Sequence, residues 1–163
     1  MKKRVVIFGD SNTWGYDAAT GGRFNEEIRW PMVTAKLLGS EYRILEEGLC
    51  GRTTCLDDPF NEGLSGLTYL LPCLQTHSPI DMLVIMLGTN DCKQRFSLTA
   101  ANIALGMRRL VKKALEAEVW RDKPNILVIA PGPILKECEL SDVGKNMGIC
   151  SDKSYEIAKE YEL

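Results

Sequence analysis

Histidine is nearly absent from this sequence: its 163 residues include one, His77, and its six cysteines form no Cys-x-x-Cys pair. Because zinc sites are built largely from histidine and closely spaced cysteine, this composition predicts no metal site. The sequence also lacks a G-x-G-x-x-G motif and a G-K-S/T motif. Those motifs bind dinucleotides and phosphates, so no cofactor is expected.

Long apolar runs are missing as well. The run that follows the basic residues of the N-terminus extends only from Val5 to Phe8, which is too short for the core of a signal peptide. No stretch approaches the roughly 20 apolar residues that span a bilayer. We therefore expect a cytoplasmic protein with no membrane partner, whose cysteines are reduced and mostly buried.

No charge of one sign dominates the chain. Twenty basic residues stand against 22 acidic ones, for a formal net charge of −2, and no run of like charge occurs. The basic cluster between Arg108 and Lys113 contains no aromatic side chains on which bases could stack, so it indicates a solvated helix face. We expect no nucleic-acid partner, and instead a small molecule without strong charge.

Strand-like and helix-like patterns alternate along the chain. Short apolar runs, most of them closed by glycine or proline, predict buried parallel strands at residues 4–8, 82–87 and 126–130, with a weaker strand at 43–46. Helical spacing or helix-end signals predict helices at residues 31–38, 64–77 and 99–118, and a further helix capped by Ser151. This alternation predicts an α/β fold with a parallel sheet, built as one domain over residues 1–163.

Three loops that follow predicted strands carry polar groups suited to catalysis. Ser11 lies two residues after Gly9, Gly51 follows the weaker strand, and Asn90 follows the strand at 82–87. In parallel sheets, ligands bind at the carboxyl ends of the strands, where these loops meet. Each feature alone is also explained by an ordinary turn or helix cap. Together, a serine, a glycine N–H and an asparagine amide form a nucleophile with an oxyanion hole for acyl transfer.

The same residues carry a resemblance to a known family. G-D-S-N at residues 9–12, the glycine of G-R-T-T at 51–54 and G-T-N-D at 88–91 resemble three sequence blocks of the SGNH (GDSL-like) hydrolases. Arg29-Trp30, residues 46–48, 57–59, 86–91 and 103–107 resemble the arylesterase and acyltransferase branch. The resemblance implies a flavodoxin-like three-layer α/β/α sandwich, Ser11 as nucleophile, and oxyanion donors from Ser11 N–H, Gly51 N–H and the Asn90 side chain.

The family's second catalytic motif is missing. SGNH hydrolases supply their aspartate and histidine from a D-x-x-H motif near the C-terminus, and here the residue three before His77 is Leu74. Strand length places His77 about 20 Å from Asn90, at the amino-terminal side of the sheet, so we expect a structural role for it. A Ser-Lys pair with Lys93, or Asp91 acting alone, is the alternative base.

The domain is therefore expected to be incomplete at its C-terminus, without its last strand and helix. Loss of an outer strand leaves an open sheet edge, which favours a homo-oligomer. If the 163 residues are the whole expressed chain, we predict negligible esterase activity.

For the complete protein, the sequence predicts a serine esterase or acyltransferase that acts on small carboxylic esters through an acyl-enzyme on Ser11. Asp10, Trp14, Pro131 and Ile134 are the residues expected to contact the substrate, although Trp14 is equally explained by core packing. One alternative is a non-catalytic domain of the same fold that binds a small ester or carbohydrate. Another is a flavodoxin-like nucleotide or flavin binder, which the absence of a phosphate-binding loop disfavours.

Overall fold

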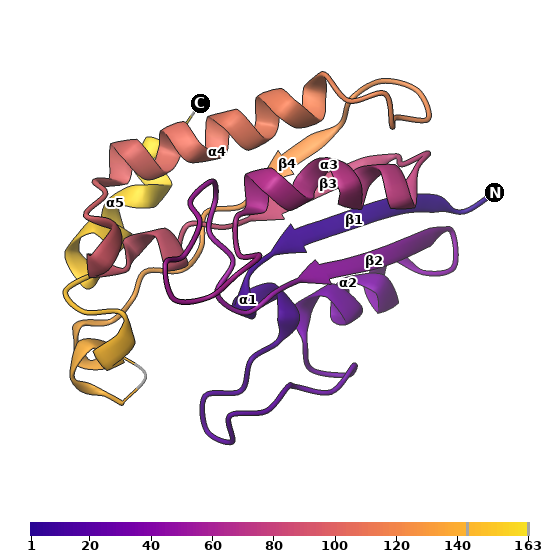
Figure 1. Ribbon diagram of the computed structural model, residues 1–163. Helices are drawn as coiled ribbons and strands as arrows, with labels where there is room; N and C mark the ends of the chain where they lie inside the picture. Colours follow the sequence, from indigo (N-terminus) through magenta and orange to yellow (C-terminus); the bar gives the residue numbers. More distant parts are fainter. Residues whose placement is uncertain (143, 163) are drawn as a thin grey trace.

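A four-stranded parallel sheet forms the centre of the molecule (Figure 1). The computed structural model describes residues 1–142 and 144–162. Its strands are β1 (Lys3–Gly9), β2 (Tyr42–Gly48), β3 (Met82–Met86) and β4 (Ile126–Val128), and their spatial order is β2-β1-β3-β4. All three pairings are parallel, which confirms the predicted α/β class.

The central position of β1 and β3 explains their continuous apolar sequences. Val5, Val6, Ile7 and Phe8 are all almost fully buried, because a central strand of a covered sheet meets a helix layer on either face. The edge strands were predicted less accurately. β2 is three residues longer than the predicted 43–46, and β4 ends at Val128, two residues before the predicted end of its apolar run.

Helices cover both faces of the sheet. One face carries α3 (Gly66–His77), α4 (Ala100–Leu115) and α5 (Ser151–Glu160), which enclose the larger hydrophobic core. The other face carries α2 (Trp30–Leu38), whose Trp30 packs on the smaller core of Val5, Ile7 and Val84. This arrangement confirms the predicted three-layer sandwich (Figure 1). Within the described ranges, no helix has the length and apolarity needed to cross a bilayer.

Helix α4 follows the sequence pattern closely. The Thr99 hydroxyl accepts a hydrogen bond from the Asn102 N–H, and the Asn102 side chain accepts one from the Thr99 N–H, so the helix begins with a capping box. Met107 and Leu110 on its apolar face are fully buried, while the basic residues lie on the exposed face. The helix ends at Leu115, three residues before the predicted end.

The predicted cap of the last helix is wrong. Ser151 is the first residue of α5, and its N-terminus is capped from a distance by the Glu139 carboxylate. Glu139 Oε1 accepts hydrogen bonds from the N–H groups of Cys150 (2.9 Å) and Ser151 (2.8 Å) and from the Ser151 hydroxyl (2.7 Å). These three bonds favour the ionised carboxylate and lower the pKa of Glu139 to about 2.

Replacement of Glu139 by glutamine is expected to lower the melting temperature by an amount that depends on pH. Folding lowers the pKa of Glu139 from 4.5 to about 2. The stabilisation is therefore fully present above pH 4.5 and is lost as the pH falls towards 2. Thermal unfolding of Glu139→Gln and wild type across this range measures the difference. Glu137→Gln, at an exposed neighbouring position, is the control, and a wild-type advantage that does not change with pH would contradict this account.

Candidate active site

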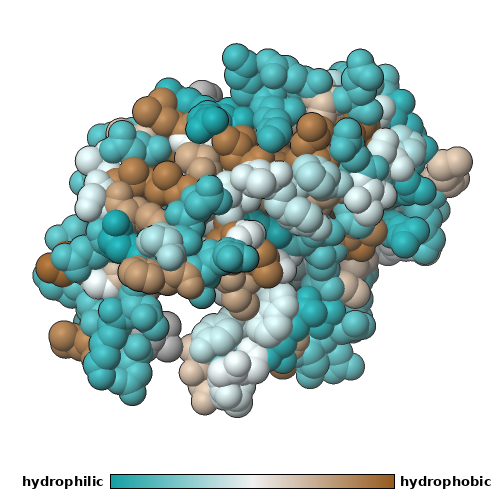
Figure 2. Space-filling model, in the orientation of Figure 1, coloured by the Kyte–Doolittle hydropathy of each residue, from teal (hydrophilic) through white to brown (hydrophobic). Residues whose placement is uncertain are grey.

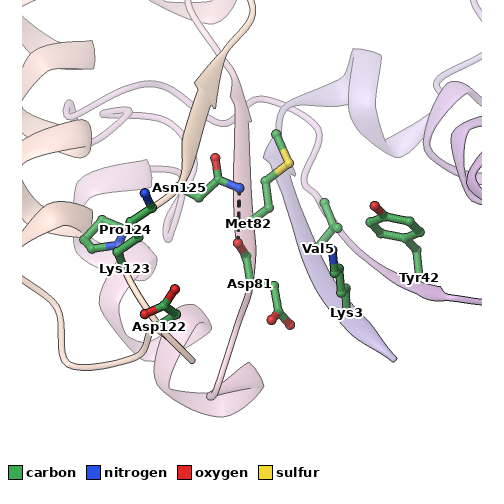
Figure 3. Close-up of a pocket in the computed structure, with 9 residues that line it drawn as sticks. All are labelled: Lys3, Val5, Tyr42, Asp81, Met82, Asp122, Lys123, Pro124 and Asn125. Atoms are coloured by element: carbon green, nitrogen blue, oxygen red, sulfur yellow. Dashed lines mark hydrogen bonds between the residues drawn. The ribbon is translucent and has the colours of Figure 1, made fainter. Parts of the chain in front are cut away.

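Two hollows lie at opposite ends of the sheet. The hollow at the amino ends of the strands has a volume of about 490 Å³, and its described lining residues, drawn in Figure 3, include no serine, cysteine or histidine. They are Lys3, Val5, Tyr42, Asp81, Met82, Asp122, Lys123, Pro124 and Asn125. The hollow at the carboxyl ends measures about 750 Å³, within the range of small-molecule sites. Ser11, Gly51 and Asn90 all line this second cavity.

The mouth of the active-site cavity opens between two irregular segments. Tyr16 and Ala18 of the loop after α1 contribute to the lining of the cavity. Further lining residues come from the chain before α5: Gly132, Pro133, Ile134, Leu135, Cys138, Ser141, Gly144, Asn146, Met147 and Cys150. Figure 2 shows this opening as a notch at the lower edge of the molecule, between the loop that follows α1 and the segment that precedes α5. A substrate can therefore reach the carboxyl ends of the strands from solvent.

Ser11 begins a four-residue helix, α1 (Ser11–Trp14), directly after β1. The Asp10 carboxylate caps this helix by accepting a hydrogen bond from the Asn12 N–H at 2.9 Å, and Gly15 ends it in a left-handed conformation. The turn rests on the end of β2, because a Cβ atom at Gly48 would lie only 2.6 Å from Trp14 Cα. Glycine at position 48 thus allows the close packing that holds Ser11 in place.

Asp10 lies beneath the turn and not in the cavity. Its side chain is fully buried, and burial raises the pKa of its carboxyl to about 6 against the opposing effect of the Asn12 hydrogen bonds. It is not among the residues that line the cavity, although the sequence predicted that it would contact substrate. The structure instead gives Asp10 the task of capping α1.

The loop after β2 presents Gly51 to the cavity and is held by Arg52. Gly51 has a φ of +87°, and a Cβ atom there would lie 2.9 Å from Leu64 Cδ1, so both backbone and packing favour glycine. The buried Arg52 guanidinium donates hydrogen bonds to the carbonyls of Gly9, at 3.0 Å, and Glu47. Its Cζ also lies 4.2 Å from the centre of the Phe8 ring. Arg52 therefore links the ends of β1 and β2 to the Gly51 loop.

The loop after β3 is tied to the same structure. The buried Asn90 amide donates a hydrogen bond to the Arg52 carbonyl at 3.1 Å. The Asp91 carboxylate accepts hydrogen bonds from the Thr54 N–H at 3.0 Å and from the Thr54 hydroxyl at 2.6 Å. Burial raises the pKa of Asp91 to about 6, while the bonds from Thr54 oppose that rise. Asn90 is consequently held beside Gly51 by buried polar contacts.

Three hydrogen-bond donors converge on the cavity. Within the described part of the chain, the backbone N–H groups of Ser11 and Gly51 have no hydrogen-bond acceptor. The Asn90 amide has two N–H bonds, and its contact with the Arg52 carbonyl uses one of them. Donors that are fixed before reaction and left free for the developing charge are what an oxyanion hole requires. The cavity therefore contains the types of donor from which an oxyanion hole is built.

The described lining of the cavity offers no clear base for Ser11. His77 is not among the residues that line the cavity, and its Nε2 lies 2.6 Å from Glu47 Oε1. Lys93 does line the cavity, but its Nζ lies 3.6 Å from Asp58 Oδ2, and Arg95 donates to the same oxygen. Burial lowers the pKa of Lys93, which by itself favours lysine as a base, whereas the ion pair with Asp58 opposes that shift. The carboxylate of Asp91 is already engaged with Thr54.

The remaining predicted substrate contacts are placed differently by the structure. Ile134 lines the cavity, whereas Trp14 and Pro131 are not among its lining residues. Trp14 packs against Arg23, whose Cζ lies 5.1 Å from the ring centre, and Pro131 is buried. Sequence reasoning missed the wall residues Tyr16, Cys50, Leu135, Cys138, Met147 and Cys150. Most of them lie in irregular segments, where no periodic pattern indicates which side chains face inward.

Comparisons with known proteins agree with this geometry. A model of the GDSL-like lipase/acylhydrolase family matches residues 7–149. The native aryl esterase of M. smegmatis is 39% identical over 98% of this chain and 77% of its own, with a TM-score of 0.84. Est24, a carbohydrate acetylesterase from Sinorhizobium meliloti, is 38% identical over 99% of this chain and 78% of its own, with a TM-score of 0.86. No match was found among curated proteins.

A more distant structure shares the fold. The SGNH-hydrolase family esterase AlinE4 is 18% identical over 99% of this chain and 74% of its own, with a TM-score of 0.63. At that level of identity, the comparison concerns the arrangement of the backbone alone. The sheet and the helix layers around the cavity are thus common to relatives of very different sequence.

Proposed function

The chain belongs to the GDSL-like lipase/acylhydrolase family, and from this we propose that Ser11 is the nucleophile of a carboxylic ester hydrolase or acyltransferase. The observation that carries the proposal is the convergence of Ser11, Gly51 and Asn90 on one cavity at the carboxyl ends of the strands. Two of these residues offer free backbone N–H groups, and the third offers an amide. This combination suits acyl transfer better than phosphate or nucleotide binding.

The proposed reaction has two steps. Ser11 Oγ attacks the ester carbonyl carbon, and the carbonyl oxygen becomes an oxyanion that accepts hydrogen bonds from Ser11 N–H, Gly51 N–H and the Asn90 amide. The intermediate collapses to an acyl-enzyme, and the alcohol leaves with the proton that Ser11 gave up. Water or a second alcohol then attacks the acyl carbon, which releases the acid or a new ester and returns a proton to Ser11.

The substrate class follows from the cavity and the relatives. Ile134, Leu135 and Met147 contribute apolar side chains to the cavity that Ser11 also lines. The solved relatives are named as an aryl esterase and a carbohydrate acetylesterase. We propose small acyl groups, such as acetyl, carried on an aromatic or sugar alcohol.

The D-x-x-H motif that supplies the family's proton acceptor does not occur in these 163 residues. We expect the chain alone to turn over esters slowly, because Ser11 has no base within this sequence that fits the family pattern. An intact oxyanion hole still leaves roughly 10³- to 10⁴-fold catalysis over water when a triad member is missing. A small external base should therefore restore part of the activity.

Imidazole is expected to activate Ser11 towards p-nitrophenyl acetate. The protein is incubated with the ester and increasing imidazole, and release of p-nitrophenol is followed together with the intact mass of the protein. We expect imidazole-dependent turnover above the protein-free rate, and a single acetyl group on Ser11. Ser11→Ala should abolish both signals.

The same experiment tests the non-catalytic alternative. If wild type and Ser11→Ala give equal rates at every imidazole concentration and no acetyl group is found, the chain is not an esterase of this type. A domain that binds small esters or carbohydrates without reaction would then be favoured, because the described cavity would lack an active nucleophile.

A further inference from the structure

One face of helix α3 carries three polar groups that meet a carboxylate on strand β2. Tyr69, Cys73 and His77 recur every four residues, so they lie in one row along the helix. The row faces Glu47: the Tyr69 hydroxyl donates to Glu47 Oε2 at 3.3 Å, and His77 Nε2 lies 2.6 Å from Glu47 Oε1. None of these four residues lines the cavity that contains Ser11.

Three of the four side chains are good ligands for transition metals. A Glu47 oxygen, Cys73 Sγ and a His77 ring nitrogen all lie within 4.8 Å of one another. Zinc bonds of about 2.0–2.3 Å in a tetrahedral site place ligand atoms about 3.3–3.8 Å apart. The present spacing therefore needs only small side-chain movements, chiefly a widening of the His77–Glu47 contact. The ligands do not need the close sequence spacing of a Cys-x-x-Cys motif, because the fold brings Glu47 next to Cys73 and His77.

We propose that Glu47, Cys73 and His77 bind one divalent transition metal ion of the zinc class. Carboxylate oxygen, thiolate sulfur and imidazole nitrogen form a mixed donor set that zinc accepts, and water or Tyr69 completes the four positions. Cys73 is fully buried, whereas the side chains of Glu47 and His77 are 19% and 22% exposed. The ion can thus enter from the solvent side and meet the buried sulfur last.

A zinc-class ion binds cysteine as the thiolate, so binding at Cys73 releases one proton to solvent. The Arg52 guanidinium, whose Cζ lies 5.2 Å from the Tyr69 ring centre, adds a positive charge near the site that opposes binding of a cation. Two anionic ligands, a carboxylate and a thiolate, offset the ion's two charges and favour its binding against that repulsion.

The site would join helix α3 to the strand whose end supports Ser11. Glu47 is the residue before Gly48, on which α1 rests, and Cys73 and His77 belong to α3, which packs against β1. An ion held between them would clamp α3 to the edge strand and stabilise the folded chain according to its concentration. The inference does not depend on the proposed esterase function, since none of its ligands takes part in that reaction.

Cobalt and zinc binding test the proposal on the purified 163-residue protein. We expect Co²⁺ to produce a thiolate-to-cobalt charge-transfer band that saturates at one ion per chain. Zinc retained after dialysis should match that stoichiometry, and added zinc should raise the melting temperature. Cys73→Ser should remove the charge-transfer band, and His77→Gln should weaken binding at least about tenfold. Cys138→Ser, which removes an exposed thiol outside the cluster, should leave all three signals unchanged.

Several outcomes would overturn the metal site. They are the absence of bound ion, a band that persists in Cys73→Ser, and a band that disappears in Cys138→Ser, which would assign the signal to adventitious surface thiols. Circular dichroism of each variant shows whether it is folded. If Cys73→Ser does not fold, the half-buried His77→Gln decides the question, and unchanged affinity in that variant rejects the proposal.

Discussion

Arg52→Ala is expected to lower the free energy of unfolding by about 3–5 kcal/mol, the largest stability effect that the site predicts. The substitution removes a guanidinium that packs against both the Phe8 and Tyr69 rings, and removal of a comparably long buried side chain costs about 2–5 kcal/mol. It also removes charge-assisted hydrogen bonds to the carbonyls of Gly9 and Glu47, each worth about 1.5–3 kcal/mol. The desolvation cost of a buried guanidinium offsets part of this sum.

Thermal unfolding measures the effect of Arg52→Ala. For a domain of this size, the expected loss corresponds to a fall in melting temperature of about 6–20 °C. Arg43→Ala is the matched control, because Arg43 lies on β2 but is exposed, and its replacement should change stability by less than about 0.5 kcal/mol. Arg52→Met separates packing from hydrogen bonding, since it retains side-chain volume without the donors. Equal melting temperatures for Arg52→Ala and Arg43→Ala would show that Arg52 does not hold the loops.

Asn90→Ala is expected to reduce imidazole-dependent acetylation of Ser11 by about 10²- to 10³-fold. Loss of one oxyanion donor has this effect because the donor acts on charge that develops only in the transition state. The substitution also removes the contact to the Arg52 carbonyl, so stability must be measured in parallel. The rate constant for p-nitrophenol release, compared at the same imidazole concentration, gives the effect.

A second cavity asparagine provides the control for Asn90. Asn146 also lines the cavity and is exposed, and Asn146→Ala makes the same chemical change in the segment before α5, outside the three loops that carry Ser11, Gly51 and Asn90. We expect less than a few-fold loss in that variant. A comparable loss in both variants would point to general damage to the cavity, and no loss in Asn90→Ala would remove Asn90 from the oxyanion hole.

The framework of the sheet could be predicted because local sequence determines it. Val5–Phe8 is apolar without interruption, which is what a central strand buried on both faces requires. The sequence shows glycine at positions 48 and 51. It does not show why position 48 requires glycine, because that requirement comes from the backbone of α1, some 34 residues earlier in the chain. Ser11, Gly51 and Asn90 each follow a strand of a parallel sheet. Because the carboxyl ends of such strands lie at one edge, the sequence could predict that the three residues lie in the same region.

The contacts that hold the site could not be predicted in the same way. Arg52 reads as one more polar residue in a turn, yet it is buried against Phe8, a residue 44 positions away. The cap of α5 was assigned to Ser151 by local rules, although Glu139 supplies it across an irregular segment. Likewise, Cys73 and His77 show helical spacing in the sequence, but Glu47 joins them only through the packing of α3 on β2. Such contacts arise from tertiary structure, whereas the periodicity of a sequence reports only local secondary structure.

Two exposed thiols in the cavity can be alkylated or oxidised, and such modification would affect the cavity independently of any reaction with esters. Cys50 and Cys138 line it from the loop after β2 and from the segment before α5, respectively. Alkylating agents or oxidation products attached to either sulfur would occupy the space intended for substrate. Burial and the neighbouring Asp10 raise the pKa of Cys50, which slows its reaction with such agents at neutral pH. If the chain has the proposed esterase activity, storage in air should therefore lower that activity while Ser11 stays unmodified, and a reductant in the buffer should prevent the loss.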